Sequence, residues 1–209
     1  RKIKLGIHLC TMLSFPDFDS GAIQLGFIHL HTHSEFSFNA GIPKPEEMAQ
    51  KAKALGMTQI ALTDTNRMSG LILFYKACRK HNIKPILGVE LTSPINEGEK
   101  VDLLAKNKKG YEELCTLTSE RNLHSEFSFN VAFNRFWENL IILSNDDRVV
   151  EMIAKGPNRG NLFGELINTD SAYIQKSRAV EKTCVENGIP VVATNDTYFL
   201  DRSDRETHK

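Results

Sequence analysis

Short apolar runs alternate with longer segments of helical period along most of the chain. The apolar runs predict seven strands, at 27–30, 59–62, 85–89, 101–105, 140–143, 162–167 and 191–193. The segments between them predict helices at 45–55, 71–81, 109–119, 148–155 and 173–187. Strands that alternate with helices are typical of a parallel α/β domain. Polar residues just after each strand favour a closed or nearly closed barrel over an open doubly wound sheet, although the periodicity alone fits both.

The first 26 residues do not follow this alternation. We assign them to an N-terminal extension, whose role the sequence does not reveal, followed by one domain at 27–209. The first helix of that domain has marked ends. Pro45 stands at its start, where the missing N–H is not needed, and Gly56 stands where a left-handed cap is expected.

The composition of the 209 residues, 41% hydrophobic and 25% charged, is that of a folded domain with a sizeable core. Basic and acidic residues number 26 each, so no overall positive field attracts nucleic acid, and we expect DNA contact to be only indirect. The four cysteines form no C-x-x-C pair, which argues against a zinc ribbon. No apolar run approaches the roughly 18 residues of a membrane span. We therefore expect a cytoplasmic protein with no membrane partner.

Histidines occupy every second position at His29, His31 and His33, directly after an apolar strand start. On a strand, that spacing directs all three imidazoles to one face. A single histidine there would be explained by ordinary hydrogen bonds. Three histidines at alternate positions favour a site for zinc, manganese or iron.

Acidic residues follow three of the later apolar runs, at Asp64, Glu90 and Asp196. Taken singly, each carboxylate is most often a turn former or a helix cap. In a parallel barrel, however, the strand ends meet at one rim. We therefore expect these carboxylates to lie close to the histidines.

Together these blocks resemble the PHP (polymerase and histidinol phosphatase) domain, in the version found at the N-terminus of the bacterial DNA polymerase III alpha subunit. The resemblance runs in order from about residue 27 to the end of the chain. The blocks that carry it are His29–Ser37, Ala61–Asp64, Lys84–Glu90, Leu104–Asn107 with Gly110 and Tyr111, Leu140–Ser144, and Ala193–Asp196.

The resemblance implies a distorted, TIM-like barrel of seven β/α units. It also implies a rim that holds up to three metal ions and hydrolyses phosphate esters in active members. His31 and His33 match the paired histidines of the family. Asp64, Glu90 and Asp196 match its acidic ligands, with Glu90 as the expected bridge between ions.

The chain departs from the family pattern at three histidine positions, which hold Thr65, Lys100 and Tyr198. Threonine and tyrosine are poor ligands for a divalent ion at neutral pH, and an ammonium repels one. Asp146 is a candidate replacement ligand, and we expect Lys100 to pair with Glu90 or Asp196 in place of a metal. The site is therefore expected to be degenerate, holding one divalent ion, zinc or manganese, or none.

Three functions remain open from the sequence. The favoured one is a mainly structural PHP module of a replicative polymerase, whose partners are the remainder of that chain and replication proteins. The alternative is a standalone metal-dependent phosphoesterase acting on a small phosphate ester or a nucleic-acid 3′ end. The third is an interaction protein on a barrel scaffold, which a rim blocked by side chains would favour.

One heptapeptide, His-Ser-Glu-Phe-Ser-Phe-Asn, occurs twice, at His33–Asn39 and at His124–Asn130. The second copy has no counterparts of His31 and Thr32 before it, so it cannot duplicate a site built on alternating histidines. We expect it to form an amphipathic edge that covers the core with Phe127 and Phe129.

Overall fold

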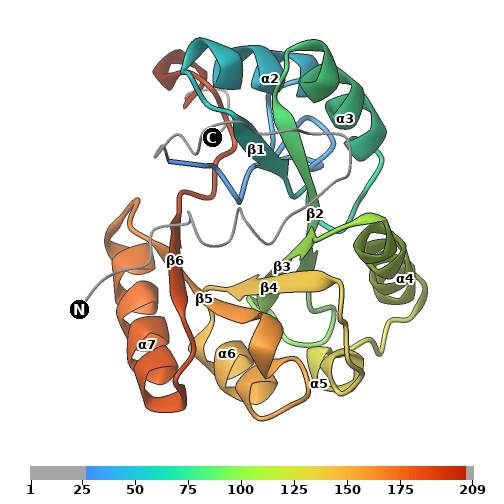
Figure 1. Ribbon diagram of the computed structural model, residues 1–209. Helices are drawn as coiled ribbons and strands as arrows, with labels where there is room; N and C mark the ends of the chain where they lie inside the picture. Colours follow the sequence, from blue (N-terminus) through green and yellow to red (C-terminus); the bar gives the residue numbers. More distant parts are fainter. Residues whose placement is uncertain (1–26, 206–209) are drawn as a thin grey trace.

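Six of the seven predicted apolar runs form strands, and these make one curled sheet surrounded by helices (Figure 1). The computed structural model describes residues 27–205, so the predicted extension at 1–26 lies outside the described residues. The strands lie side by side in chain order: β1 (Gln59–Leu62), β2 (Lys84–Thr92), β3 (Lys100–Ala105), β4 (Leu140–Ser144), β5 (Leu162–Ile167) and β6 (Val191–Thr194). The fold is therefore mixed α/β, with a sheet that curls into a half-barrel.

The predicted helices are all present. They are α2 (Pro45–Ala54), α3 (Leu71–Lys80), α4 (Lys108–Leu123), α6 (Asp147–Ala154) and α7 (Ser171–Asn187). Gly56 has a φ of 71°, as expected for the residue that ends the first of them. The sequence did not predict the short helix α5 (Phe129–Phe133) or the 3₁₀ turns Arg159–Asn161 and Arg202–Arg205. No helix among residues 27–205 is both long and apolar enough to cross a membrane.

The sheet is not wholly parallel, which corrects one expectation. β3 runs antiparallel to both β2 and β4, whereas the other neighbouring strands are parallel. The connection from β2 to β3 is a short loop of residues 93–99, which is too short for the crossover that a parallel neighbour requires. Consequently β3 starts, rather than ends, at the rim where β2 ends.

The predicted first strand at 27–30 is also absent, so the seven-unit barrel is not confirmed. Residues 29–33 do make backbone hydrogen bonds to β1 at one edge of the sheet and to the segment just after β6 at the other edge. His29 accepts from Ala61 on one side, and His31 accepts from Thr197 on the other. Regular pairing fails because threonine side chains replace ladder bonds: Thr32 Oγ1 donates to the carbonyl of Ala61, and the Thr32 N–H donates to Thr63 Oγ1.

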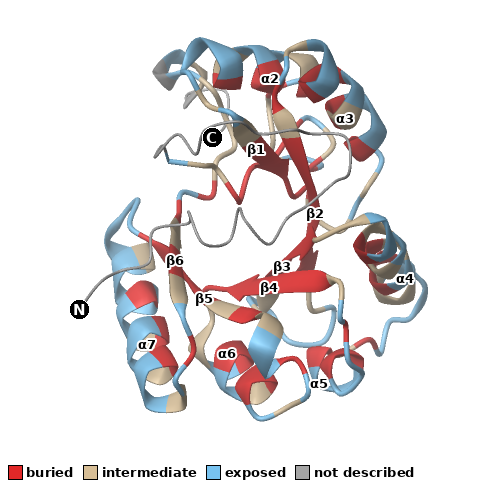
Figure 2. Cartoon of the chain, viewed as in Figure 1, coloured by how far each residue is buried: buried red, intermediate tan, exposed pale blue. Residues whose placement is uncertain are grey.

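The two faces of the sheet carry different side chains. The outer face packs against the helices, and Figure 2 shows each helix buried on its inward side and exposed on its outward side. The inner face holds a smaller apolar cluster that includes Ala61, Ile86, Leu104 and Ile141. Side chains alternate along a strand, so Glu90 shares the inner face with Ile86, as Asp102 does with Leu104. The inner face is thus apolar at one end and acidic at the other.

Candidate metal centre

Four of the predicted ligands come together at the acidic end of the sheet. His31 and His33 come from the irregular segment before α2, Glu90 from β2, and Asp196 from the turn after β6. All four side chains are buried. His29 does not join them, because the segment that holds the three histidines is not a regular strand. Its ring instead packs edge-on against Phe27.

The two histidines converge on one carboxylate oxygen. The Nε2 atoms of His31 and His33 each lie 3.2 Å from Asp196 Oδ1. None of these three buried atoms makes a hydrogen bond. Buried polar atoms are normally paired, so three unpaired donor atoms that converge in this way are suited to bind a cation. Asp196 has a φ of 47°, a left-handed conformation that aspartate tolerates better than most residues.

Asp102 is a fifth member of the cluster that the sequence reasoning missed. It lies opposite Glu90 in the register of β2 and β3. Its Oδ1 lies 3.3 Å from His31 Nε2, as does Glu90 Oε2. Asp102 is buried, and neither of its oxygens makes a hydrogen bond. The sequence feature that could have indicated Asp102 is a lone carboxylate inside the apolar run of β3, rather than at a strand end.

Glu165 is a second residue that the sequence reasoning missed, and it holds His31 from behind. Its Oε1 lies 2.8 Å from His31 Nδ1 and accepts a 2.6 Å hydrogen bond from Thr194. A carboxylate on Nδ1 fixes the tautomer of a metal-binding histidine and leaves Nε2 free for the ion. As with Asp102, the signal was one acidic residue within an apolar strand, here β5.

Asp64 lies near the cluster but supports it rather than facing its centre. Its carboxylate accepts hydrogen bonds from the Ser34 N–H and hydroxyl, both at 2.7 Å, and from Ser37 Oγ at 2.8 Å. Ser37 Oγ in turn lies 2.9 Å from His33 Nδ1. Because Ser37 donates its proton to Asp64, it accepts from His33 Nδ1–H, and this leaves His33 Nε2 as a free donor atom for a metal.

The three residues expected to stand in place of family histidines, Thr65, Lys100 and Tyr198, contact members of the cluster. Lys100 Nζ lies 2.7 Å from Glu90 Oε2 and 3.1 Å from Asp196 Oδ2, which confirms the expected pairing and extends it to both carboxylates. Thr65 Oγ1 donates to Glu90 Oε1 at 2.9 Å. The Tyr198 ring stacks on His33, with centroids 4.2 Å apart. An ammonium, a hydroxyl and an aromatic ring thus lie against the carboxylates and histidine of the cluster.

Asp146 lies elsewhere. It caps α6, accepting from the backbone N–H of Arg148 and Val149, and its other oxygen pairs with the Arg148 guanidinium at 2.8 Å. These contacts are those of an ordinary N-cap residue. They provide no link between Asp146 and the cluster.

The buried charges of the cluster shift one another's pKa values. Burial disfavours a charged imidazole, but Asp102, Glu165 and Asp196 outweigh that effect and raise the pKa of His31 well above its usual value. Burial also raises the pKa of Asp102. The pKa values of Glu90 and Asp196 are lowered despite their burial, because His31 and Lys100 lie beside them. A metal ion entering the cluster would therefore displace protons.

The donor set could hold a metal ion. Two groups each bring three potential ligand atoms within 4.8 Å of one another: His31, His33 and Asp196, and His31, Glu90 and Asp102. Both share His31, so they describe adjoining positions rather than two independent sites. A further ion beside Glu90 would meet the Lys100 ammonium. Imidazole nitrogens with carboxylate oxygens suit zinc and manganese.

Comparison with known proteins agrees with this geometry. The profile of the PHP domain family matches residues 29–166. The DNA polymerase III subunit alpha of Buchnera aphidicola subsp. Schizaphis graminum is 34% identical over 213 residues, and that of Escherichia coli K12 is 32% identical over 214. Each alignment covers 88% of this chain but only 18% of the relative, so the chain spans less than a fifth of their length.

Two solved structures share the fold. One is a presumed metal-dependent phosphoesterase from Bifidobacterium adolescentis, with a TM-score of 0.52 and 14% identity. The other is an amidohydrolase from Chromobacterium violaceum, with a TM-score of 0.51 and 13% identity. Each alignment covers 82% of this chain and 87% of the other. With the family match over residues 29–166 and the paired histidines and carboxylates in place, this chain belongs to the PHP domain family.

Proposed function

We propose that this chain is the PHP domain of a protein like the bacterial DNA polymerase III alpha subunit, with a role in DNA replication that is mainly structural. The polymerase relatives support the assignment. Its partners would be the remainder of a polymerase chain and other replication proteins in the cytoplasm. The backbone hydrogen bonds of residues 29–33 to both ends of the sheet support the distorted seven-unit barrel as its architecture.

The observation that carries this proposal is the position of Lys100. Its ammonium bridges Glu90 and Asp196, which match acidic ligands of the family. A buried carboxylate pair needs a positive charge, and here the protein supplies one covalently. An ammonium is neither a Lewis acid nor a source of bound hydroxide, so the second ion of a two-metal hydrolase has no equivalent.

One ion remains compatible with the other donors. His31, His33 and Asp196 would hold it, with Glu165 and Ser37 fixing the two imidazoles. A bound divalent ion would lower the pKa of a coordinated water and neutralise a phosphate oxygen. In a two-metal hydrolase, one ion activates the attacking water and the other neutralises the phosphate. A single ion leaves one of these two roles unfilled, so we expect hydrolysis to be slow.

Metal content and hydrolysis test the proposal together. The unmodified chain, loaded with zinc or manganese and then desalted, is expected to hold no more than one ion and to hydrolyse aryl phosphates and single-stranded DNA ends negligibly. The variant Thr65→His, Lys100→His, Tyr198→His is expected to hold more metal and to gain activity. Lys100→Met is the matched control, because it removes the ammonium without adding a ligand. Two or more ions in the unmodified chain would contradict the proposal.

A second candidate function is a standalone metal-dependent phosphoesterase. The observation in its favour is the set of buried, unpaired donor atoms at His31, His33 and Asp196. Enzyme-like hydrolysis by the unmodified chain, abolished by His31→Ala, would select this alternative over the structural role.

A further inference from the structure

A cavity of about 570 Å³ opens beside the metal centre. Its walls come from the first heptapeptide copy, from the segment between β1 and α3, and from the end of α4, including Phe38, Thr65, Arg67, Thr118 and Arg121. Its volume lies within the roughly 300–1,000 Å³ of small-molecule sites. Thr65 links the cavity to the metal centre, because it lines the cavity and its hydroxyl donates to Glu90. The cavity is therefore positioned to hold a ligand next to the centre.

The lining is positively charged. Arg67 and Arg121 line the cavity, and no carboxylate does. Arg121 donates to the carbonyl and hydroxyl of Thr92, at 3.0 and 2.9 Å, so neutral acceptors hold its guanidinium in place. Within residues 27–205 neither arginine has a carboxylate partner. Two guanidinium groups without counter-ions favour an anion, and guanidinium geometry suits phosphate.

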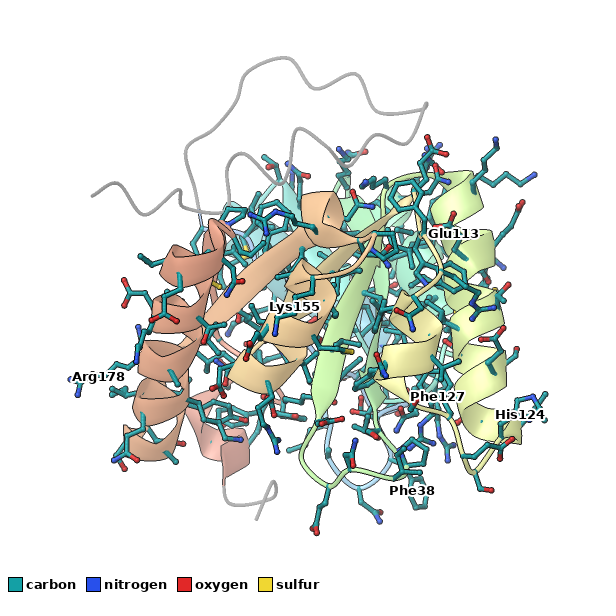
Figure 3. The ribbon with its side chains drawn as sticks, turned by 90° about the horizontal axis from the view of Figure 1, so that it is seen from below. Phe38, Glu113, His124, Phe127, Lys155 and Arg178 are labelled. Carbon is teal, nitrogen blue, oxygen red and sulfur yellow. The ribbon has the colours of Figure 1, made fainter. Side chains whose placement is uncertain are left out.

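An aromatic ring stands at the same opening. Phe38 is 72% exposed, and the Arg67 guanidinium lies over its ring, 5.4 Å from the centroid. Figure 3 shows Phe38 at the edge of the molecule. An exposed ring beside an arginine is the arrangement on which a nucleic-acid base stacks. An acidic peptide would use the two charges but not the ring, so the ring favours a nucleotide.

One buried hydroxyl in the lining has no hydrogen-bond partner. Thr118 lines the cavity and is only 8% exposed, and its Oγ1 makes no hydrogen bond. Threonine hydroxyls in helices normally bond to a nearby carbonyl or to water. The oxygen itself is buried, so the two guanidinium groups and the exposed ring, rather than this hydroxyl, carry the inference.

We propose that this cavity binds a nucleoside phosphate, with the base on Phe38 and the phosphate between Arg67 and Arg121. The ligand is either a free nucleotide or the end of a single strand. This inference goes beyond the proposed function and replaces the expectation that DNA meets the domain only indirectly. It needs no metal, so its test is run in EDTA and its outcome is independent of the ion content of the centre.

The test is calorimetric titration of the whole chain with deoxyadenosine monophosphate, inorganic phosphate and a short oligodeoxyadenylate. The nucleotide is expected to bind at least about tenfold more tightly than phosphate, because stacking adds to the ionic contact. Oligonucleotide binding tighter than nucleotide binding identifies a strand end as the ligand. Weaker oligonucleotide binding identifies a free nucleotide, and both results support the proposal.

Two variants locate the binding. Phe38→Ala is expected to weaken nucleotide binding about 5- to 150-fold, as for loss of one stacked base, and to leave phosphate binding unchanged. Arg67→Gln should weaken both. Phe136→Ala and Arg178→Gln are the matched controls, since both residues are exposed and neither lines the cavity. Nucleotide binding no tighter than phosphate binding, or unchanged binding in Phe38→Ala and Arg67→Gln, would overturn the proposal.

Discussion

The two copies of the heptapeptide have the same seven residues and opposite burial. In the first, the His33, Ser34 and Ser37 side chains are buried and Phe38 is 72% exposed. In the second, His124 is exposed, whereas Phe127 and Phe129 are buried in the core. Figure 3 labels His124 and Phe127. The expected amphipathic edge is thus confirmed for the second copy. The polar residues point inward in one copy and the apolar ones in the other.

Surroundings, not local sequence, decide between these conformations. The first copy winds into turns around Asp64, and Gly41 closes them so tightly that a Cβ there would lie 1.9 Å from the Ser34 carbonyl oxygen. The second copy has no buried carboxylate to bind. Its Ser128 instead caps α5, accepting from the Val131 N–H, and this turns the phenylalanines toward the helices. The seven residues alone therefore do not determine which of their side chains are buried.

The last phenylalanine of each copy should give the largest contrast. Phe129→Ala is expected to lower the free energy of unfolding by about 3–5 kcal/mol, because it empties a fully packed position. Phe38→Ala should cost less than about 1 kcal/mol, since only the contact with Arg67 is lost. Urea denaturation measures both. Equal losses would contradict the opposite burial of the two rings, and Phe129→Leu serves if the alanine variant does not fold.

The first histidine of each copy should differ in metal binding. His33→Ala removes a ligand atom and is expected to weaken zinc binding by more than about 100-fold, beyond the 10- to 100-fold typical of supporting residues. His124→Ala should leave zinc binding unchanged, because His124 is exposed and pairs only with Glu126. Competition with a chromogenic chelator reports both affinities. A similar loss in the two variants would place the ion elsewhere.

The second serine of each copy separates support of a metal ligand from capping. Ser37→Ala is expected to weaken zinc binding about 10-fold or more, since His33 loses its Nδ1 partner. Ser128→Ala should cost about 1 kcal/mol of stability and leave zinc affinity unchanged, because only a helix cap is lost. Chelator competition and urea denaturation are run on both variants. Unchanged zinc affinity in Ser37→Ala would remove it from the supporting network.

The pH dependence of stability should reflect the buried His31, which precedes the first copy by two residues, and not the exposed His124 of the second copy. The folded pKa of His31 is raised, so the metal-free folded state holds a proton that the unfolded chain releases above about pH 6.5. The contribution of His31 to stability is therefore greatest below that pH and falls as the pH rises, by up to about 1.4 kcal/mol per pH unit. Denaturation in EDTA between pH 6.5 and 9 measures the slope. His124→Gln should not change it, and stability that rises over this range would refute the sign.

The sequence predicted the parts of the centre that follow regular rules. The strand ends place Glu90 and Asp196 at one rim, as expected, whereas His31 and His33 reach it from an irregular segment. Asp102 and Glu165 could not be found in that way, since they lie inside strands, where an isolated acidic residue usually signals nothing. The direction of β3 was likewise not predictable from periodicity, which is the same for a strand read either way. Asp64 was placed correctly near the histidines, but its hydrogen bonds to serines depend on a turn that periodicity does not encode.

The alternation of side chains along β3 also determines which substitutions the rim tolerates. On this strand, Val101, Leu103 and Ala105 pack in the outer core, and Lys100 and Asp102 occupy the alternate positions. A slip of one residue would exchange the two sets, so the outer residues fix the register. Substitutions at the alternate positions leave that register untouched. A point mutation at Lys100 or Asp102 can therefore change the charge and the donor atoms of the rim without shifting the sheet.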